Sequence, residues 1–138
     1  MMKVRGLNKL QARIYRISIH SDIAMRKTVK ELTQTGENMT RGLINGGAPR
    51  TGKFNTHTGT NRSAPYEPAK TDHGELASSI AHKIVSKYVG VFGTALDYGV
   101  KLELGDGIAP RPFLLPTAFR LQKKASAVLR RNTRSLIK

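Results

Sequence analysis

The sequence of 138 residues predicts an α+β fold in a single domain: a long N-terminal helix, a small antiparallel sheet, a short helix and a C-terminal helix, with a long mobile loop. Three observations lead to this prediction. Residues 1–44 contain no proline and carry apolar residues at helical spacing. Two short runs between residues 80 and 93 are typical of strands. A proline-rich segment is followed by a helical pattern that runs to Lys138.

The N-terminal helix is predicted from two apolar stripes. The second stripe runs from Met25 to Leu43 and is out of phase with the first by about one residue. Ser21 lies between the stripes and could cap a second helix, so the pattern fits either one bent helix or two abutting helices. The polar side of this segment is basic, and is either a solvated face or a surface toward nucleic acid. The first stripe consists of Leu7, Leu10, Ile14 and Ile17.

Residues 45–73 are predicted to form the long mobile loop. The run Asn45–Gly47 ends the N-terminal helix. From there to residue 73 only Phe54 and Tyr66 are large and apolar, which is too little to offset an ordering cost of roughly 1–2 kcal/mol per residue. We expect assembly with a neighbouring subunit to order this loop, with Phe54 and Tyr66 as its anchors.

The middle of the chain alternates short elements. Residues 75–79 suit one helical turn, and residues 80–87 and 88–92 suit two strands joined by a turn near Ser86 and Lys87. Residues 95–104 predict a short helix that ends at Gly105. These elements form the small sheet and the short helix of the predicted fold.

Three prolines between residues 110 and 116 exclude a helix there and predict a stiff elbow. Pro116 is suited to the first turn of the C-terminal helix. Phe113 and Leu114 are expected to be exposed on the elbow as docking side chains. The buried stripe of the C-terminal helix is predicted to be Ala118, Leu121, Ala125, Val128, Leu129 and Leu136.

The chain is strongly basic, with 24 Lys and Arg residues against 9 acidic residues and a formal charge of +15. Such a charge indicates nucleic acid, bound through its phosphates, as the first candidate partner. A ribosomal or histone-like role and an acidic protein neighbour are the alternatives. The basic residues that we expect to face DNA are Arg50, Lys53, Arg62, Lys123, Lys124, Arg130, Arg131 and Arg134.

Composition also favours an assembly. Apolar residues make up 38% of the chain, below the usual range of about 45–50%, so we expect a thin core that oligomerisation completes. The chain has no cysteine and therefore no disulfide or thiolate metal site. No apolar run approaches the length of about 20 residues needed to span a membrane, and we expect no membrane partner and a soluble protein that is intracellular at synthesis.

No pattern of catalytic residues stands out, and we expect neither an enzyme nor a cofactor. The four histidines are scattered, which does not indicate a metal site. Asp97 and Glu103 are six residues apart, so they do not share a helical face as a carboxylate pair would. Glu103 is expected to be structural, paired with an arginine of the elbow or of a neighbouring subunit. The run from Gly47 to Lys53 has the spacing of a phosphate loop, but Phe54 replaces the required Ser or Thr.

Several short motifs, taken in their order along the chain, resemble those of a known protein family. Tyr98–Gly99, Glu103–Gly105 and the elbow Pro110–Ala118 follow one another, after Ala64–Tyr66 and the strand Val89–Thr94. Together they resemble the tail-component or neck family of long-tailed phages, which includes the gene-product-ten proteins of lambdoid phages and is related to lambda's minor tail protein Z. Residues Thr71–Ile80 are similar to the family's TG-x-L-x-x-SI element, except that two residues separate Thr71 from Gly74.

The resemblance implies a structural virion protein of the head-to-tail neck, which completes the tail or joins it to the head. Such a protein would form a homo-oligomeric ring around the DNA channel, a hexamer being favoured over a dodecamer, and contact neighbouring neck and tail proteins. It would be made in the host cytoplasm and end in the virion. The expected assembly residues are Tyr98, Glu103, Arg111, Phe113 and Leu114. The competing prediction, from charge alone, is a sequence-independent nucleic-acid-binding protein.

Overall fold

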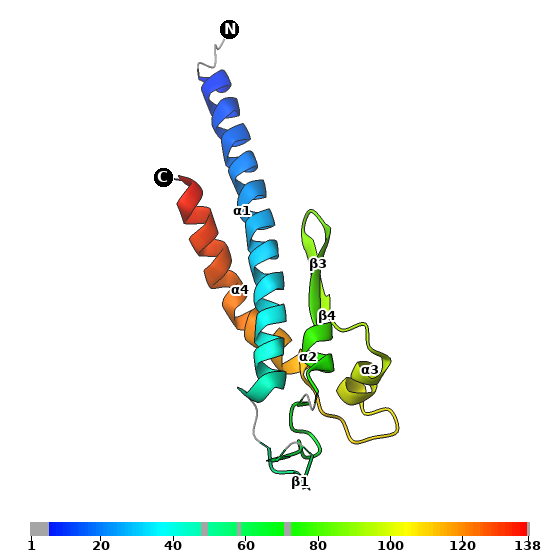
Figure 1. The fold of residues 1–138 in the computed structure, drawn as a ribbon. Helices are drawn as coiled ribbons and strands as arrows, with labels where there is room; N and C mark the ends of the chain where they lie inside the picture. Colours follow the sequence, from blue (N-terminus) through cyan, green and yellow to red (C-terminus); the bar gives the residue numbers. More distant parts are fainter. Residues whose placement is uncertain (1–5, 48–49, 58, 71–72, 138) are drawn as a thin grey trace.

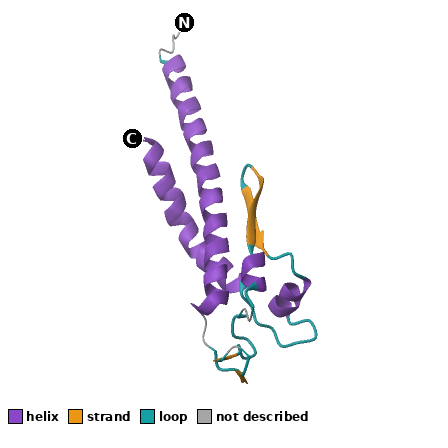
Figure 2. Cartoon of the chain, in the orientation of Figure 1, coloured by secondary structure: helices purple, strands orange, loops and turns teal. Residues whose placement is uncertain are grey.

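The computed structural model, which describes residues 6–47, 50–57, 59–70 and 73–137, has the predicted α+β fold (Figures 1 and 2). Two long helices lie side by side, and a β-hairpin packs against the longer one. Thr71 and Lys138, which belong to predicted features, lie outside the described residues. The elements in order are α1 (Leu7–Gly42), the π-helical turn η1 (Leu43–Gly47), β1 (Phe54–Asn55), β2 (Thr60–Asn61), α2 (Glu75–Ser79), β3 (Ala81–Ser86), β4 (Val89–Gly93), α3 (Asp97–Leu104) and α4 (Leu114–Ile137).

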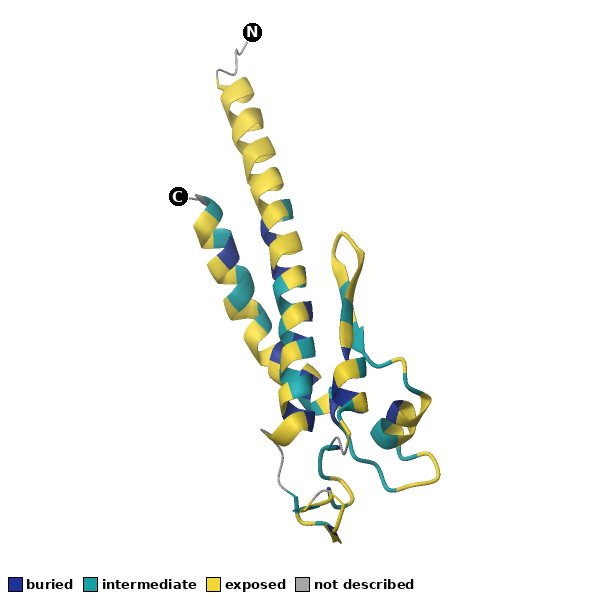
Figure 3. Cartoon of the chain, viewed as in Figure 1, coloured by how far each residue is buried: buried dark blue, intermediate teal, exposed yellow. Residues whose placement is uncertain are grey.

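Helix α1 is one continuous helix of 36 residues. Ser21 lies inside it, which decides between the two alternatives that the sequence left open. The line of the first stripe continues from Ile17 through Ser21 and Ala24 to Thr28 at spacings of four and three residues, and Ala24 and Thr28 are buried. One face of the helix therefore changes from large apolar residues to small ones along its length, and the helix changes from exposed to partly buried over the same length (Figure 3).

Helix α4 runs antiparallel to α1 and packs against its C-terminal part (Figure 1). The buried side chain of Asn132 donates to the Thr28 hydroxyl at 3.1 Å and to the Glu31 carboxylate at 3.2 Å. Arg131 forms an ion pair with the same glutamate. These contacts fix the register of α4 on α1.

The β3–β4 hairpin has the predicted position, with a turn at Lys87 and Tyr88. Its tip is attached to α1, because Lys87 Nζ lies 2.6 Å and Tyr88 Oη 2.5 Å from the Asp22 carboxylate. Gly90 of β4 approaches α1 so closely that a Cβ there would lie 2.0 Å from Thr33 Oγ1. The hairpin therefore follows the side of α1 over several turns.

The apolar core is small and lies where η1, α2 and the proline elbow meet. Phe113 is 0% exposed and is the largest fully buried side chain, so the expectation that it is an exposed docking residue is wrong. The proline elbow directs Phe113 inward, while Leu114 is partly buried against the same cluster. The core consists of Leu43, Ile44, Ala69, Leu76, Ala77, Ile80 and Phe113.

The predicted stripe of α4 is only partly correct. Leu121 is buried, but Ala118 is exposed, because the polar residues Thr117 and Asn132 occupy the buried face instead. The Thr117 hydroxyl donates to the Phe113 carbonyl at 3.1 Å. Hydrogen bonds of this kind allow a polar side chain to be buried without a large penalty.

The predicted loop contains a second small sheet that the sequence did not indicate, formed by β1 and β2. Gly52 N–H donates to the Arg62 carbonyl at 2.9 Å, beside the paired strands. The Glu67 carboxylate accepts from the N–H groups of Thr51 at 3.1 Å and Ala64 at 2.7 Å. The described part of this segment is thus held mainly by polar contacts, and it reaches the apolar core through Ala69. Its expected mobility stays a prediction.

Candidate assembly interface and basic surface

Glu103 positions the start of α4. Its carboxylate accepts hydrogen bonds from the N–H groups of Phe113 at 2.7 Å, Leu114 at 2.9 Å and Leu115 at 2.8 Å. The first N–H groups of a helix have no partner within the helix, and a negative charge there interacts favourably with the helix dipole. Glu103 therefore caps α4 from a distance of ten or more residues in sequence. It is structural, as expected, but its carboxylate binds backbone groups of the elbow rather than an arginine.

Arg111 connects the elbow to two other segments. Its N–H donates to the Leu102 carbonyl at 2.6 Å, and its Nε donates to the Ser63 carbonyl at 3.2 Å. The neighbouring Pro110 carbonyl accepts from Tyr66 N–H at 2.7 Å. The elbow is therefore held between α3 and the β1–β2 segment, and the Arg111 side chain contributes to this support.

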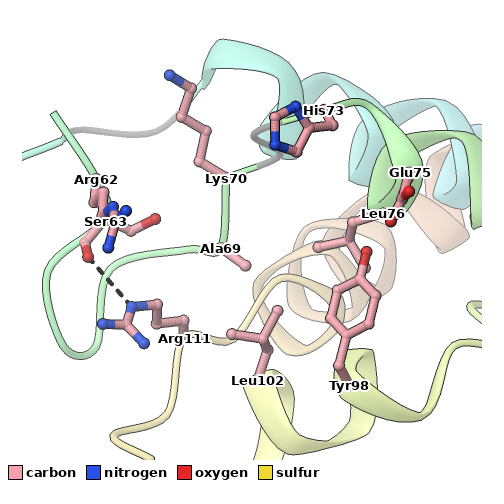
Figure 4. A pocket seen from close by; sticks show the side chains of 10 residues that line it. All are labelled: Arg62, Ser63, Ala69, Lys70, His73, Glu75, Leu76, Tyr98, Leu102 and Arg111. Carbon is pink, nitrogen blue, oxygen red and sulfur yellow. Dashed lines mark hydrogen bonds between the residues drawn. The ribbon is translucent and has the colours of Figure 1, made fainter. Parts of the chain in front are cut away.

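A half-open pocket of about 400 Å³ lies beside the elbow (Figure 4). Tyr98 forms part of its apolar side, while Lys70 and Arg111 contribute charge. Lys70 Nζ is 2.6 Å from the Thr60 hydroxyl, so both cations already have partners within the chain. Burial, and then the negative charge of Glu75, raises the pKa of the Tyr98 phenol, which keeps it protonated. The Tyr98 phenol can therefore act as a hydrogen-bond donor at the pocket.

The predicted loop anchors are exposed. Phe54 lies on β1 and Tyr66 follows β2, and both present most of their rings to solvent. The backbone of Tyr66 adopts a left-handed conformation with φ of 67°, which is uncommon for a residue with a side chain. The structure thus leaves both rings available for contact with another molecule.

The predicted DNA-facing residues fall into two groups. Arg50, Lys53 and Arg62 lie in the β1–β2 segment, away from α4 (Figure 1). The others are exposed on one side of α4, which borders α1 at Arg131, where the ion pair with Glu31 forms. We call this side the basic face of α4; it consists of Arg120, Lys123, Lys124, Arg130, Arg131 and Arg134.

The N-terminal half of α1 is the feature that sequence reasoning did not place. Its first stripe is largely exposed: Leu7 is 60%, Leu10 55%, Ile14 59% and Ile17 58% exposed. The subunit as a whole exposes 9967 Å², against about 7,100 Å² for a compact protein of its mass, an excess of about 2,900 Å². The low apolar content of the sequence predicted a thin core that an assembly completes. Overall content does not tell which segment is left exposed.

No metal centre can be built from the described part of the chain, where no group of three or more His, Cys, Asp or Glu side chains lies close together. No helix among the described residues is long and apolar enough to cross a membrane. No family model matches the chain, and no curated protein or solved structure is significantly similar to it.

Proposed function

We propose that this protein is a structural virion subunit of the head-to-tail neck of a long-tailed phage, acting in tail completion or head–tail joining as a homo-oligomeric ring around the DNA channel. The observation that carries this proposal is the excess of exposed surface, about 2,900 Å² over a compact monomer of the same mass. Obligate interfaces bury about 2,000–5,000 Å² in total, which is the scale of this excess. The resemblance of residues 64–120 to the neck family supports the neck as the place of this assembly.

The role of such a subunit is mechanical. The Glu103 cap and the elbow fix α4 relative to α3, so the basic face of α4 keeps a constant position relative to α3. Among the described residues, only Arg131 of the basic face of α4 forms an ion pair, with Glu31 of α1, and no acidic residue follows Asp106 in the sequence. In the ring this face approaches DNA or acidic neighbouring neck and tail proteins, without reading sequence. A hexamer is the favoured ring and a dodecamer the alternative.

The test is a phage genome that encodes this protein, with its reading frame interrupted and the protein supplied from a plasmid. Without the protein we expect filled heads and separate tails in electron micrographs, and joined particles when it is supplied. Labelled subunits should lie at the head–tail junction of purified virions. Normal, infectious particles in its absence would overturn the proposal.

The basic face of α4 favours a second candidate, a sequence-independent nucleic-acid-binding protein outside the virion. Such a protein binds duplex DNA as a free monomer, whereas a neck subunit binds DNA weakly until assembled. In both cases affinity falls steeply with salt, by a log–log slope near −0.9 per phosphate contacted. DNA binding by the monomer that is as tight as binding by the assembled form favours the second candidate. Sequence preference that survives at high salt contradicts both.

A further inference from the structure

The apolar stripe, Leu7, Leu10, Ile14 and Ile17, extends beyond the rest of the subunit. Asn132 of α4 pairs with Thr28, and α4 ends at Ile137. Because the two helices are antiparallel, the end of α4 reaches the level of α1 near residue 23. Residues 7–21 therefore project for about 22 Å without cover from α4 (Figure 1).

Charge decides what can cover the stripe. The first acidic residue of the chain is Asp22, while the segment of the stripe carries Lys9, Arg13 and Arg16, of which Arg13 borders the stripe and the other two lie further round the helix. Two copies of this segment packed side by side would bring three cations of each copy together with no acidic residue to offset them, which opposes association. The surface that fits the stripe is therefore apolar and acidic.

The chain carries one such surface, at the end of the molecule far from the stripe (Figure 1). Val100 and Leu104 of α3 are 52% and 74% exposed, and Asp97 lies on the same side of the helix at a spacing of three residues from Val100. Lys101 is also on this side and reduces its negative charge by one. We call this surface the α3 face; it consists of Asp97, Val100, Leu104, Asp106 and Ile108.

The acidic residues elsewhere are already engaged. Asp22, Glu31 and Glu37 form ion pairs with basic side chains of their own subunit. Glu67 and Glu103 accept hydrogen bonds from backbone N–H groups. Asp72 lies outside the described residues. The three other carboxylates of the described chain, those of Glu75, Asp97 and Asp106, form no ion pair, and all three belong to the α2–α3 end.

We propose that the apolar stripe of one subunit docks on the α3 face of a second copy of this chain. The inference rests on the proposed ring and names the surfaces that form it. The two surfaces lie at opposite ends of one subunit, so the contact joins copies head to tail, which generates a ring if it closes and a filament if it does not. Standard interfaces bury about 1,200–2,000 Å², so a subunit with one neighbour on each side loses about that area, within the excess that it exposes.

The experiment uses the full chain and two variants in native mass spectrometry and sedimentation velocity. Ile14→Glu breaks the stripe, and Leu104→Lys breaks the α3 face by placing a cation against the stripe's own cations. Each variant alone should self-associate at least tenfold more weakly than the wild type. Their mixture should form a 1:1 heterodimer, because one chain keeps the α3 face and the other keeps the stripe. Phe119→Glu is the matched control: it is an exposed apolar residue of α4 outside both surfaces and should associate as the wild type does.

Each alternative has its own result. Normal self-association by Leu104→Lys, with loss in Ile14→Glu, would show that stripes pair with each other and overturn the inference. A wild-type chain that is monomeric at every concentration, or a mixture without heterodimer, would overturn it as well. Circular dichroism spectra equal to the wild type confirm that both variants fold. Rings that form through other surfaces would contradict this inference but not the proposed function. If the docking is confirmed but phage particles are normal without the protein, only the proposed function is contradicted.

Discussion

The two halves of α1 belong to one helix but have opposite relations to the rest of the subunit. Residues 7–23 carry Leu and Ile at helical spacing, and these side chains are exposed. Residues 24–42 contain every buried residue of the helix, and these are small or polar: Ala24, Thr28, Thr33, Gly36 and Thr40. The rest of the subunit packs against the half of α1 that has small side chains. It leaves the half with large apolar side chains uncovered.

The close approach of the hairpin and of α4 to α1 explains why the packed half of α1 has small side chains. A Cβ on Gly36 would lie 2.6 Å from the Phe92 ring and 2.9 Å from Leu121, so the hairpin and α4 both reach α1 at this residue. The buried threonines are satisfied within the helix: the hydroxyls of Thr28 and Thr40 donate to the carbonyls four residues earlier at 2.8 and 2.7 Å. Small side chains with internal hydrogen bonds can thus be buried at low cost. Large apolar side chains at the other half fit an interface between subunits.

The largest effect is expected at the core beside the packed half. Phe113→Ala removes the largest fully buried side chain and should lower the free energy of unfolding by about 3–5 kcal/mol. Urea unfolding followed by circular dichroism measures this loss. Since a small domain has about 5–15 kcal/mol in total, the variant should be marginally folded. Wild-type stability in this variant would mean that Phe113 is a surface residue after all.

Gly36→Val should have the second largest effect. The new side chain overlaps Phe92 and Leu121, and overpacking of this kind costs about 1–3 kcal/mol. The matched control is Gly42→Ala in the same helix, where no atom lies within 4 Å of the new Cβ. That variant should gain up to about 1 kcal/mol from helix propensity. Equal behaviour of the two variants in urea unfolding would remove close approach as the explanation of the packed half.

Acid should weaken contacts of the packed half. The hydrogen bond from Arg131, and then that from Asn132, lowers the pKa of Glu31, and the bond with His82, followed by the charge of Arg41, lowers that of Glu37. Both folded values lie below the ordinary 4.5, so the stability that they contribute is present above that pH and is lost as the pH falls through the folded values.

We expect the melting temperature to fall below about pH 4.5, by less than Gly36→Val lowers it, because these carboxylates are near the surface. Differential scanning calorimetry across this range measures the fall. Glu31→Gln with Glu37→Gln should reduce it, since the two titrating groups are then absent. A fall that is unchanged in the double variant would place the acid-sensitive contacts elsewhere.

Local signals in the sequence were sufficient for most elements. Alternation and a turn placed the hairpin of residues 81–93, and a glycine correctly ended α3, because Gly105 adopts the left-handed conformation that glycine favours. The β1–β2 sheet was missed because it is held by backbone bonds and by Glu67, which leave no apolar periodicity. Residue spacing indicates secondary structure only where apolar residues recur regularly, and the β1–β2 sheet has almost no such pattern.

Tertiary placement was harder to predict than the elements themselves. An elbow with three prolines is stiff, but the sequence does not state which way Phe113 points from it. Glu103 was identified as structural, yet its three backbone partners lie in the elbow, ten or more residues later in the sequence, and no spacing rule links them. The apolar stripe was found by spacing, but its exposure follows from where α4 ends, which depends on the register that Asn132 and Thr28 set.

The smallest effect is expected in the exposed half. Ile14→Ala removes an apolar side chain that nothing in its own subunit covers, so unfolding measured on dilute monomer should change by no more than about 0.5 kcal/mol. Alanine also has the higher helix propensity, which offsets any small loss. At higher concentration the variant should unfold before the wild type, because association stabilises the folded chain by mass action and the variant associates less. A loss in the monomer as large as that of Gly36→Val would mean that the stripe packs within its own subunit, and the contrast between the two halves of α1 would fail.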